Sequence, residues 1–94
     1  MRKIEAEMVL AAKSHRNWKK DNTETVRCIG CTRVYLHGNE IAKVLDNGSV
    51  IPERITLKQW PTRTTLSRLW ALGVDVYQRR HTVYLNGEPF CKTH

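Results

Sequence analysis

The fold is decided by "TRVYLHGNEIAKVLDNGSV", residues 32–50. Two pairs of small or amide residues in this stretch, Gly38-Asn39 and Asn47-Gly48, tolerate positive φ and are typical of two-residue hairpin loops. The segments around them are rich in β-branched and apolar residues, which favour strands. The stretch therefore predicts an antiparallel meander, with strands at 23–28, 32–37, 40–45 and 50–57.

The two loops also predict which residues pair. A loop at Gly38-Asn39 places Leu36 opposite Ile41. A loop at Asn47-Gly48 places Leu45 opposite Val50. Pro52 cannot donate a hydrogen bond to a neighbouring strand, so the strand 50–57 is predicted to lie at an edge or to bend there. The face that we expect to be buried holds Val34, Leu36, Ile41, Leu45 and Val50.

One helix is predicted before the meander in the chain and another after it. Apolar residues recur at helical spacing between residues 2 and 15, and again in "WPTRTTLSRLWALGV", residues 60–74, where Gly73 suits a C-terminal stop. A hairpin follows, with strands from residue 74 and at 82–85, and Asn86-Gly87 forms one more turn. The predicted fold is α+β: an N-terminal helix, an antiparallel meander of about four strands, a second short helix and a closing β-hairpin, in a single small domain of residues 1–94.

Composition excludes several classes. The chain has 94 residues, of which 40% are hydrophobic and 27% charged, as in ordinary folded proteins. No apolar run approaches the roughly 18 residues of a membrane span, and the N-terminus lacks the pattern of a signal peptide. The three cysteines are an odd number, which favours a reducing compartment over a disulfide framework.

The formal net charge is +7, and it gathers at the two ends of the chain. Residues 1–21 hold six Lys/Arg and three Asp/Glu, residues 22–57 hold four of each, and residues 58–94 hold six and two. Such an excess attracts polyanions, although basic proteins also bind acidic proteins. Charge alone therefore leaves nucleic acid and an acidic partner as alternatives.

The segment 64–88 resembles the second half of a winged-helix DNA-binding domain. On the predicted helix, Ser67 and Arg68 lie opposite the apolar face, where they could enter a groove of duplex DNA. Arg79 and Arg80 fall at the tip of the hairpin, where a wing contacts phosphate, and Arg63 could hold another phosphate. However, the preceding residues 50–60 are predicted as strand, where a winged helix has a positioning helix. The alternative is a helix that covers a sheet, with solvated arginines.

A second basic patch is predicted near the end of the first helix, formed by Arg16, Lys19 and Lys20. Trp18 lies within it and is the best exposed candidate for stacking on a nucleic-acid base, although it could instead anchor the helix end. Trp70 is predicted to be core, and Trp60 to pack at an element junction.

Two Cys/His pairs have the spacing of metal ligands. Cys28 and Cys31 are separated by two residues, as are Cys91 and His94, so together they could form a Cys3His zinc site. The favoured interpretation has no metal and no cofactor, because Ile29-Gly30 suits a tight hairpin turn between the first two cysteines. The four histidines are scattered, and no catalytic triad, paired carboxylates or phosphate-binding glycine loop is apparent. We therefore do not expect an enzyme.

The segments "TRVYLHGNEIAKV", "WPTRTTLSRLWALGV" and "VYQRRHTVYLNG" resemble a family of small bacteriophage proteins. The resemblance is carried by residues 34–39, 64–73 and 83–87. It implies a phage accessory protein in the cytoplasm of the bacterial host and gives no catalytic residues. Small phage accessory proteins commonly bind DNA or inactivate a host protein.

The leading functional hypothesis is non-enzymatic binding of nucleic acid, most of all duplex DNA, through the basic helix and hairpin surfaces. The alternative is an inhibitor that docks on a host protein, such as a defence or transcription complex. Its basic ends would then match an acidic surface or a nucleic-acid channel of that partner. Neither hypothesis involves a membrane.

Overall fold

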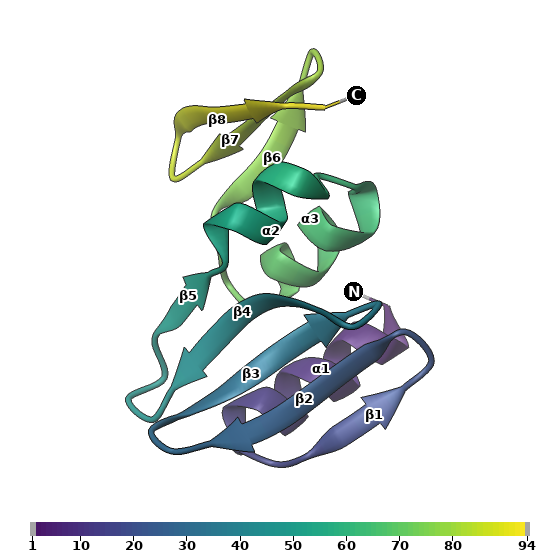
Figure 1. The fold of residues 1–94 in the computed structure, drawn as a ribbon, viewed down its shortest axis with the longest axis vertical. Coiled ribbons are helices and arrows are strands. Elements are labelled where there is room, and N and C mark those ends of the chain that lie inside the picture. Colours follow the sequence, from purple (N-terminus) through teal and green to yellow (C-terminus); the bar gives the residue numbers. More distant parts are fainter. Residues whose placement is uncertain (1, 94) are drawn as a thin grey trace.

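The computed structural model describes residues 2–93 and shows two antiparallel sheets with a pair of short helices between them (Figure 1). The α+β class predicted from the sequence is confirmed. A five-stranded sheet has the order β1-β2-β3-β4-β5, and a three-stranded sheet has the order β6-β7-β8. The helices are α1 (Lys3–Lys13), α2 (Arg54–Gln59) and α3 (Arg63–Ala71). The strands are β1 (Trp18–Lys20), β2 (Thr23–Cys28), β3 (Cys31–Leu36), β4 (Asn39–Leu45), β5 (Val50–Pro52), β6 (Val76–Arg79), β7 (Thr82–Leu85) and β8 (Glu88–Lys92).

Helix α1, which the sequence predicted between residues 2 and 15, lies across one face of the large sheet (Figure 1). Strand β3 alternates as a half-buried strand should: Thr32 and Val34 are buried under the helix, while Arg33 and Tyr35 are only partly covered on the other face. Met8 of α1 is fully buried against this layer. The larger sheet thus has one closed and one open face.

The register of the β3–β4 hairpin differs from the prediction. The loop is His37-Gly38, so Leu36 pairs with Asn39, and the register then shifts between Val34 and Tyr35. The shift is a β-bulge in which β4 contributes an extra residue. Because of this extra residue, both Ile41 and the residue after it are buried.

The bulge explains why Leu45 is not buried as predicted. It reverses the inward and outward positions along β4, so Val44 is buried and pairs with Val50, whereas Leu45 is partly exposed. The turn signal itself was right, because Asn47 and Gly48 lie in the loop between β4 and β5. The prediction that Leu45 and Val50 form a buried pair was wrong.

The predicted strand 50–57 is confirmed only as far as Pro52, and β5 lies at the edge of the sheet, as Pro52 predicted. Strand β5 ends at Pro52, which has no N–H for the ladder, and α2 begins two residues later. The first bond of α2 runs from the Leu57 N–H to the Glu53 carbonyl oxygen over 3.0 Å. The short helix α2 brings Leu57 into the core, where its side chain is 1% exposed, and leaves Ile55 exposed to solvent. Tertiary burial of one leucine outweighs the β-branched composition of the segment.

One hydrophobic cluster joins α1, the large sheet, the helix pair and the inner face of the small sheet. The small sheet contributes Val76, Val83 and Leu85, which point toward the helices. Two strands were missed by the sequence analysis, the short β1 and the C-terminal β8. None of the helices within residues 2–93 combines the length and the apolar run that a membrane crossing requires.

Candidate nucleic-acid interface

The chain from α2 to β7 follows the order of a helix–turn–helix with a hairpin after it. The helix that the sequence analysis did not find is α2, and Trp60, Pro61 and Thr62 form the turn before α3. Thr62 caps α3, because its side-chain oxygen accepts a hydrogen bond from the Thr65 N–H over 3.1 Å. The segment therefore has the element order of a winged helix, which the sequence alone did not predict.

The predicted groove-facing side of α3 is not available. Arg68 is 3% exposed, and its guanidinium donates to Glu5 Oε2 over 2.9 Å and to Thr23 Oγ1 over 3.2 Å. The hydroxyl of Ser67 donates to the same Glu5 oxygen. The prediction that Ser67 and Arg68 face DNA is thus wrong, because this side of α3 packs on α1.

The Glu5 carboxylate is held in its charged form. Burial by itself raises the pKa of Glu5, but hydrogen bonds from Ser67 and Arg68, and one from the Arg2 backbone, outweigh burial and lower the pKa below its ordinary value. The pair is therefore an ionic contact that fixes α1 against α3. It is structural, and it removes Arg68 from any binding surface.

The exposed side of α3 carries different residues. Arg63, a predicted phosphate contact, is exposed at the first turn of the helix. Trp70 is 61% exposed and Trp60 is 53% exposed, although both were predicted to pack. The apolar side of α3 is centred on Leu69, which is fully buried, and this rotates Trp70 outward. A large aromatic ring on this side makes close entry of α3 into a major groove less favourable.

The tip of the β6–β7 hairpin carries the predicted basic residues. Arg79 pairs with Thr82 across the strands, and Arg80 and His81 form the two-residue turn. Both turn residues have positive φ, 51° and 66°, and all three basic residues of the tip are exposed. A turn of this kind favours Asn-Gly, and the chain uses that pair in its next hairpin, at Asn86-Gly87. The Arg80-His81 turn is therefore locally unfavourable.

The basic residues of the C-terminal half are mostly free of carboxylate partners. Residues 54–94 hold seven Lys/Arg and two Asp/Glu. Within the described residues, Arg68 is the one member of this group that forms an ion pair. Arg54 lies over the Phe90 ring, with its guanidinium carbon 5.8 Å from the ring centre. The cations without a carboxylate partner in residues 2–93 are Arg54, Lys58, Arg63, Arg79, Arg80 and Lys92.

The second predicted patch is only partly free. Arg16 and Lys19 are exposed, but Lys20 donates to Glu7 Oε2 over 3.0 Å. Trp18 is half-buried and packs on the core cluster, so it is an anchor of β1 and a poor stacking surface. Strand β1 and the β6–β7 tip lie at opposite ends of the long axis (Figure 1). The two basic patches therefore do not form one continuous surface.

The structure does not bring the candidate metal ligands together. Cys28 pairs with Cys31 across a tight turn of the large sheet, whereas Cys91 lies on β8 at the other end of the molecule (Figure 1). Within residues 2–93, no three His, Cys, Asp or Glu side chains gather in a way that could hold a metal ion. Burial raises the pKa of the Cys91 thiol, and nearby Lys58 opposes this only in part. His94 lies outside the described residues.

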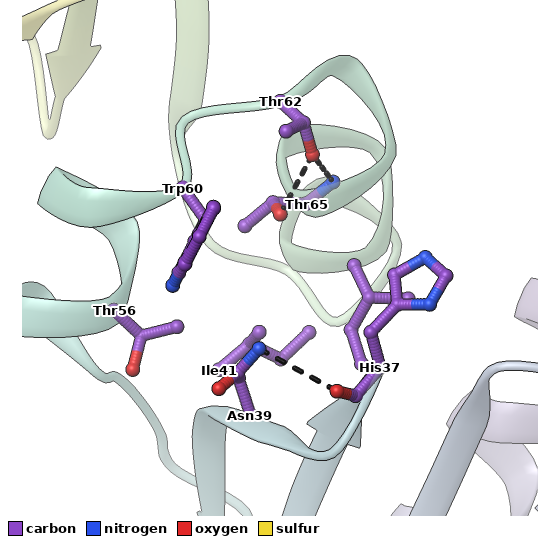
Figure 2. A pocket seen from close by; sticks show the side chains of 8 residues that line it. His37, Asn39, Ile41, Thr56, Trp60, Thr62 and Thr65 are labelled. Carbon is purple, nitrogen blue, oxygen red and sulfur yellow. Dashed lines mark hydrogen bonds between the residues drawn. The ribbon is translucent and has the colours of Figure 1, made fainter.

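A mostly apolar cleft opens beside the helix pair (Figure 2). It has a volume of about 280 Å³ and lies between the β3–β4 turn, represented by His37 and Asn39, and the Trp60 side of the helix pair. Few polar groups point into it, so its chemistry suits an apolar side chain of a ligand or partner. Its lining residues are Leu36, His37, Asn39, Ile41, Thr56, Trp60, Thr62 and Thr65.

Fold and surface together define a small α+β protein whose net positive charge is greatest in the helix pair and the three-stranded sheet, residues 54–94. The whole chain, residues 1–94, matches the family model described as "Kyanoviridae Gp96 protein", and the chain belongs to this family of bacteriophage proteins. The expectation of a small bacteriophage protein is confirmed. Neither a curated protein nor a solved structure matches the chain.

Proposed function

We propose that the protein binds nucleic acid through its C-terminal half, inside the bacterial host cell and without catalysing a reaction. The observation that carries the proposal is the charge excess of residues 54–94, which hold seven Lys/Arg and only two Asp/Glu, and six of these cations form no ion pair within the described residues. Unpaired cations attract the phosphate backbone and release its counterions on binding.

The tip of the β6–β7 hairpin is the centre of the proposed contact. Arg79, Arg80 and His81 are exposed there, and the residue after β8 supports the tip, because the Thr93 N–H donates to the His81 carbonyl oxygen over 2.8 Å. Arg63 adds a cation at the start of α3. With Arg68 buried, these groups reach phosphates and not base edges, so the expected binding is weakly dependent on sequence.

Fluorescence anisotropy tests the proposal with three labelled probes: a DNA duplex, a DNA single strand and an RNA single strand of equal length. We expect at least one probe to bind at low salt, and sequence-independent binding commonly has a Kd on the order of 10⁻⁴ to 10⁻⁶ M at physiological salt. Failure of all three probes at low salt would contradict the proposal.

A second candidate function is docking on a host protein, such as a defence or transcription complex. It is favoured by exposed apolar groups on α2 and at its end: Ile55 is 69% exposed, and Trp60, which lines the cleft, is 53% exposed. A pull-down from host lysate, with and without nuclease, separates the two functions. Loss of all partners after nuclease supports nucleic acid, whereas a stoichiometric protein that survives nuclease and is lost with Ile55→Glu supports docking.

A further inference from the structure

The face of the three-stranded sheet that points away from the helices carries two ordered rows of side chains. In the first row, which we call the aromatic row, Tyr77 pairs with Tyr84 and Tyr84 pairs with Pro89. The alternating residues Val76 and Leu85 are buried on the other face, which confirms that the aromatic row points outward.

The second row, the basic row, lies two residues further along the same strands. Arg79 pairs with Thr82, and Thr82 pairs with Lys92. Both cations are exposed, and neither forms an ion pair within residues 2–93. The two acidic residues of this half of the chain, Asp75 and Glu88, belong to neither row.

The aromatic row leaves one ring surface open. The rings of Tyr77 and Tyr84 are stacked, with their centres 5.1 Å apart and an angle of 11° between their planes. Tyr84 belongs to the central strand, between Tyr77 and Pro89, and is half-buried. Tyr77 belongs to the edge strand β6 and is 40% exposed, so the side of its ring that does not cover Tyr84 is free to extend the stack.

The two rows have the spacing of a nucleotide. Residues two apart on one strand are separated by about 7 Å along it, because the rise is about 3.4 Å per residue. A base stacked on Tyr77 thus places its phosphate within reach of Arg79, and Lys92 continues the positive charge across the sheet. Aromatic rings beside cations on an open sheet are typical of surfaces that bind single strands.

We propose that this face binds single-stranded nucleic acid, with a base stacked on Tyr77 and the backbone held by Arg79 and Lys92. The inference rests on the proposed function and deepens it by naming the form of the ligand. Bases in a duplex are already stacked and present only their edges, so an open ring such as Tyr77 adds nothing to duplex binding. The strand is identified by its unstacked bases and phosphates, which DNA and RNA share.

The test compares labelled oligothymidine and oligouridine of roughly ten nucleotides with a duplex of equal length. The main variant is Tyr77→Thr, which removes the ring and keeps a residue that favours strands. Tyr77→Phe keeps the ring and removes only the hydroxyl. Trp70→Ala is the matched control, because it removes an exposed aromatic ring that lies on α3, away from the sheet face. Melting temperatures are recorded for each variant, since cross-strand aromatic pairs also stabilise a sheet.

We expect both single strands, or one of them, to bind more tightly than the duplex. Tyr77→Thr should weaken single-strand binding by roughly 10- to 100-fold and leave duplex binding nearly unchanged, while Tyr77→Phe and Trp70→Ala should bind within about twofold of the wild type. Photocrosslinking of an iodouracil-substituted strand should map to Tyr77, and this measurement does not depend on the stability of a variant.

Three results separate the hypotheses. If the duplex binds as tightly as the single strands, or if Tyr77→Phe and Tyr77→Thr bind alike and crosslinks fall elsewhere, the single-strand inference is wrong while nucleic-acid binding stands. If no probe binds at low salt, the inference and the proposed function both fail. A response of one single strand and not the other supports the inference and identifies the ligand as DNA or RNA.

Discussion

The two halves of the molecule treat their charges in different ways. In the N-terminal half, the Glu40 carboxylate lies 3.2 Å from Arg33 Nη1 and 3.8 Å from Lys43 Nζ. Lys20 forms an ion pair with Glu7. This half holds nine Lys/Arg and seven Asp/Glu in residues 1–53, whereas residues 54–94 hold seven and two. The acidic residues of the first half therefore nearly match its basic residues in number, whereas the second half has a net charge of +5.

The two halves differ in net charge more than in their number of ion pairs. Surface ion pairs contribute little to stability, so the seven acidic residues of the N-terminal half matter mainly because they offset the charge of its nine Lys/Arg. The C-terminal half has a net charge of +5, the kind of surface that attracts a polyanion, and this is the basis of the proposed function. The Glu5–Arg68 pair is the one ionic contact that joins the halves within the described residues.

Loss of the Glu5–Arg68 ion pair should have the largest effect on stability. Arg68→Ala leaves the Glu5 carboxylate buried without its cation, and we expect it to lower the free energy of unfolding by roughly 3–5 kcal/mol. Arg27→Ala removes an exposed cation of β2 and serves as the control, with an expected change within about 0.5 kcal/mol. Chemical denaturation measures both variants.

A double variant distinguishes the ion pair from simple loss of packing. Replacing both Glu5 and Arg68 by leucine removes the two buried charges together. We expect this double variant to recover most of the free energy of unfolding that Arg68→Ala loses. An Arg68→Ala variant as stable as Arg27→Ala would show that the two halves are not joined by this pair.

The contribution of the Glu5–Arg68 ion pair to stability should also depend on pH. The pKa of Glu5 is lowered in the folded protein, so its contribution to stability is complete above the pKa of the unfolded chain, about 4.3, and is lost as the pH falls through the folded value. Thermal unfolding of wild type and Glu5→Gln should therefore differ most near neutral pH and converge in acid. A difference that does not depend on pH would rule out the carboxylate as the cause.

The loop between β4 and β5 tests the N-terminal half alone. Gly48 has φ of 89°, and a Cβ at this position would meet no atom within 4 Å. Gly48→Val should therefore destabilise the protein through backbone conformation and not through a clash, by roughly 1 kcal/mol or more. Gly48→Asn is the control and should lose less, since asparagine tolerates positive φ. Equal losses in the two variants would contradict this explanation.

The smallest expected change in stability comes from exchanging the two hairpin turns of the small sheet. Converting Arg80-His81 to Asn-Gly copies the sequence of the neighbouring Asn86-Gly87 turn, which has the same signs of φ. We expect a gain of roughly 1 kcal/mol together with weaker binding of nucleic acid, because a strained turn is relieved and a cation is removed. A variant that is more stable and binds as well as the wild type would show that the tip is not part of the interface.

The sequence predicted the fold where turn chemistry is local and failed where one distant contact decides. Asn47-Gly48 and Asn86-Gly87 lie in turns as expected, because each pair determines its own backbone conformation. The bulge in β4 and the single helical turn that buries Leu57 have no periodic signal, so Leu45 and the segment 53–57 were misplaced.

The candidate site divides in the same way. Arg79 and Arg80 were placed correctly at a hairpin tip, since the turn is a local feature. Arg68 was misplaced because its partner Glu5 is 63 residues away in the chain. The exposed ring of Tyr77 was missed, although the alternation in "VYQR" and "TVYL" places both tyrosines on one face once the register is known.

The salt dependence of binding tests the central claim most directly. The dissociation constant of a labelled single strand is measured at several salt concentrations for wild type, for Arg79→Ala with Arg80→Ala, and for a control that removes two exposed cations of the other half, Lys3→Ala with Arg27→Ala. We predict that the slope of log K against log salt falls by about one unit for each phosphate interaction that the first double variant removes, and that the control keeps the slope of the wild type. An equal reduction in both double variants, or no reduction in either, would contradict the assignment of binding to the C-terminal half.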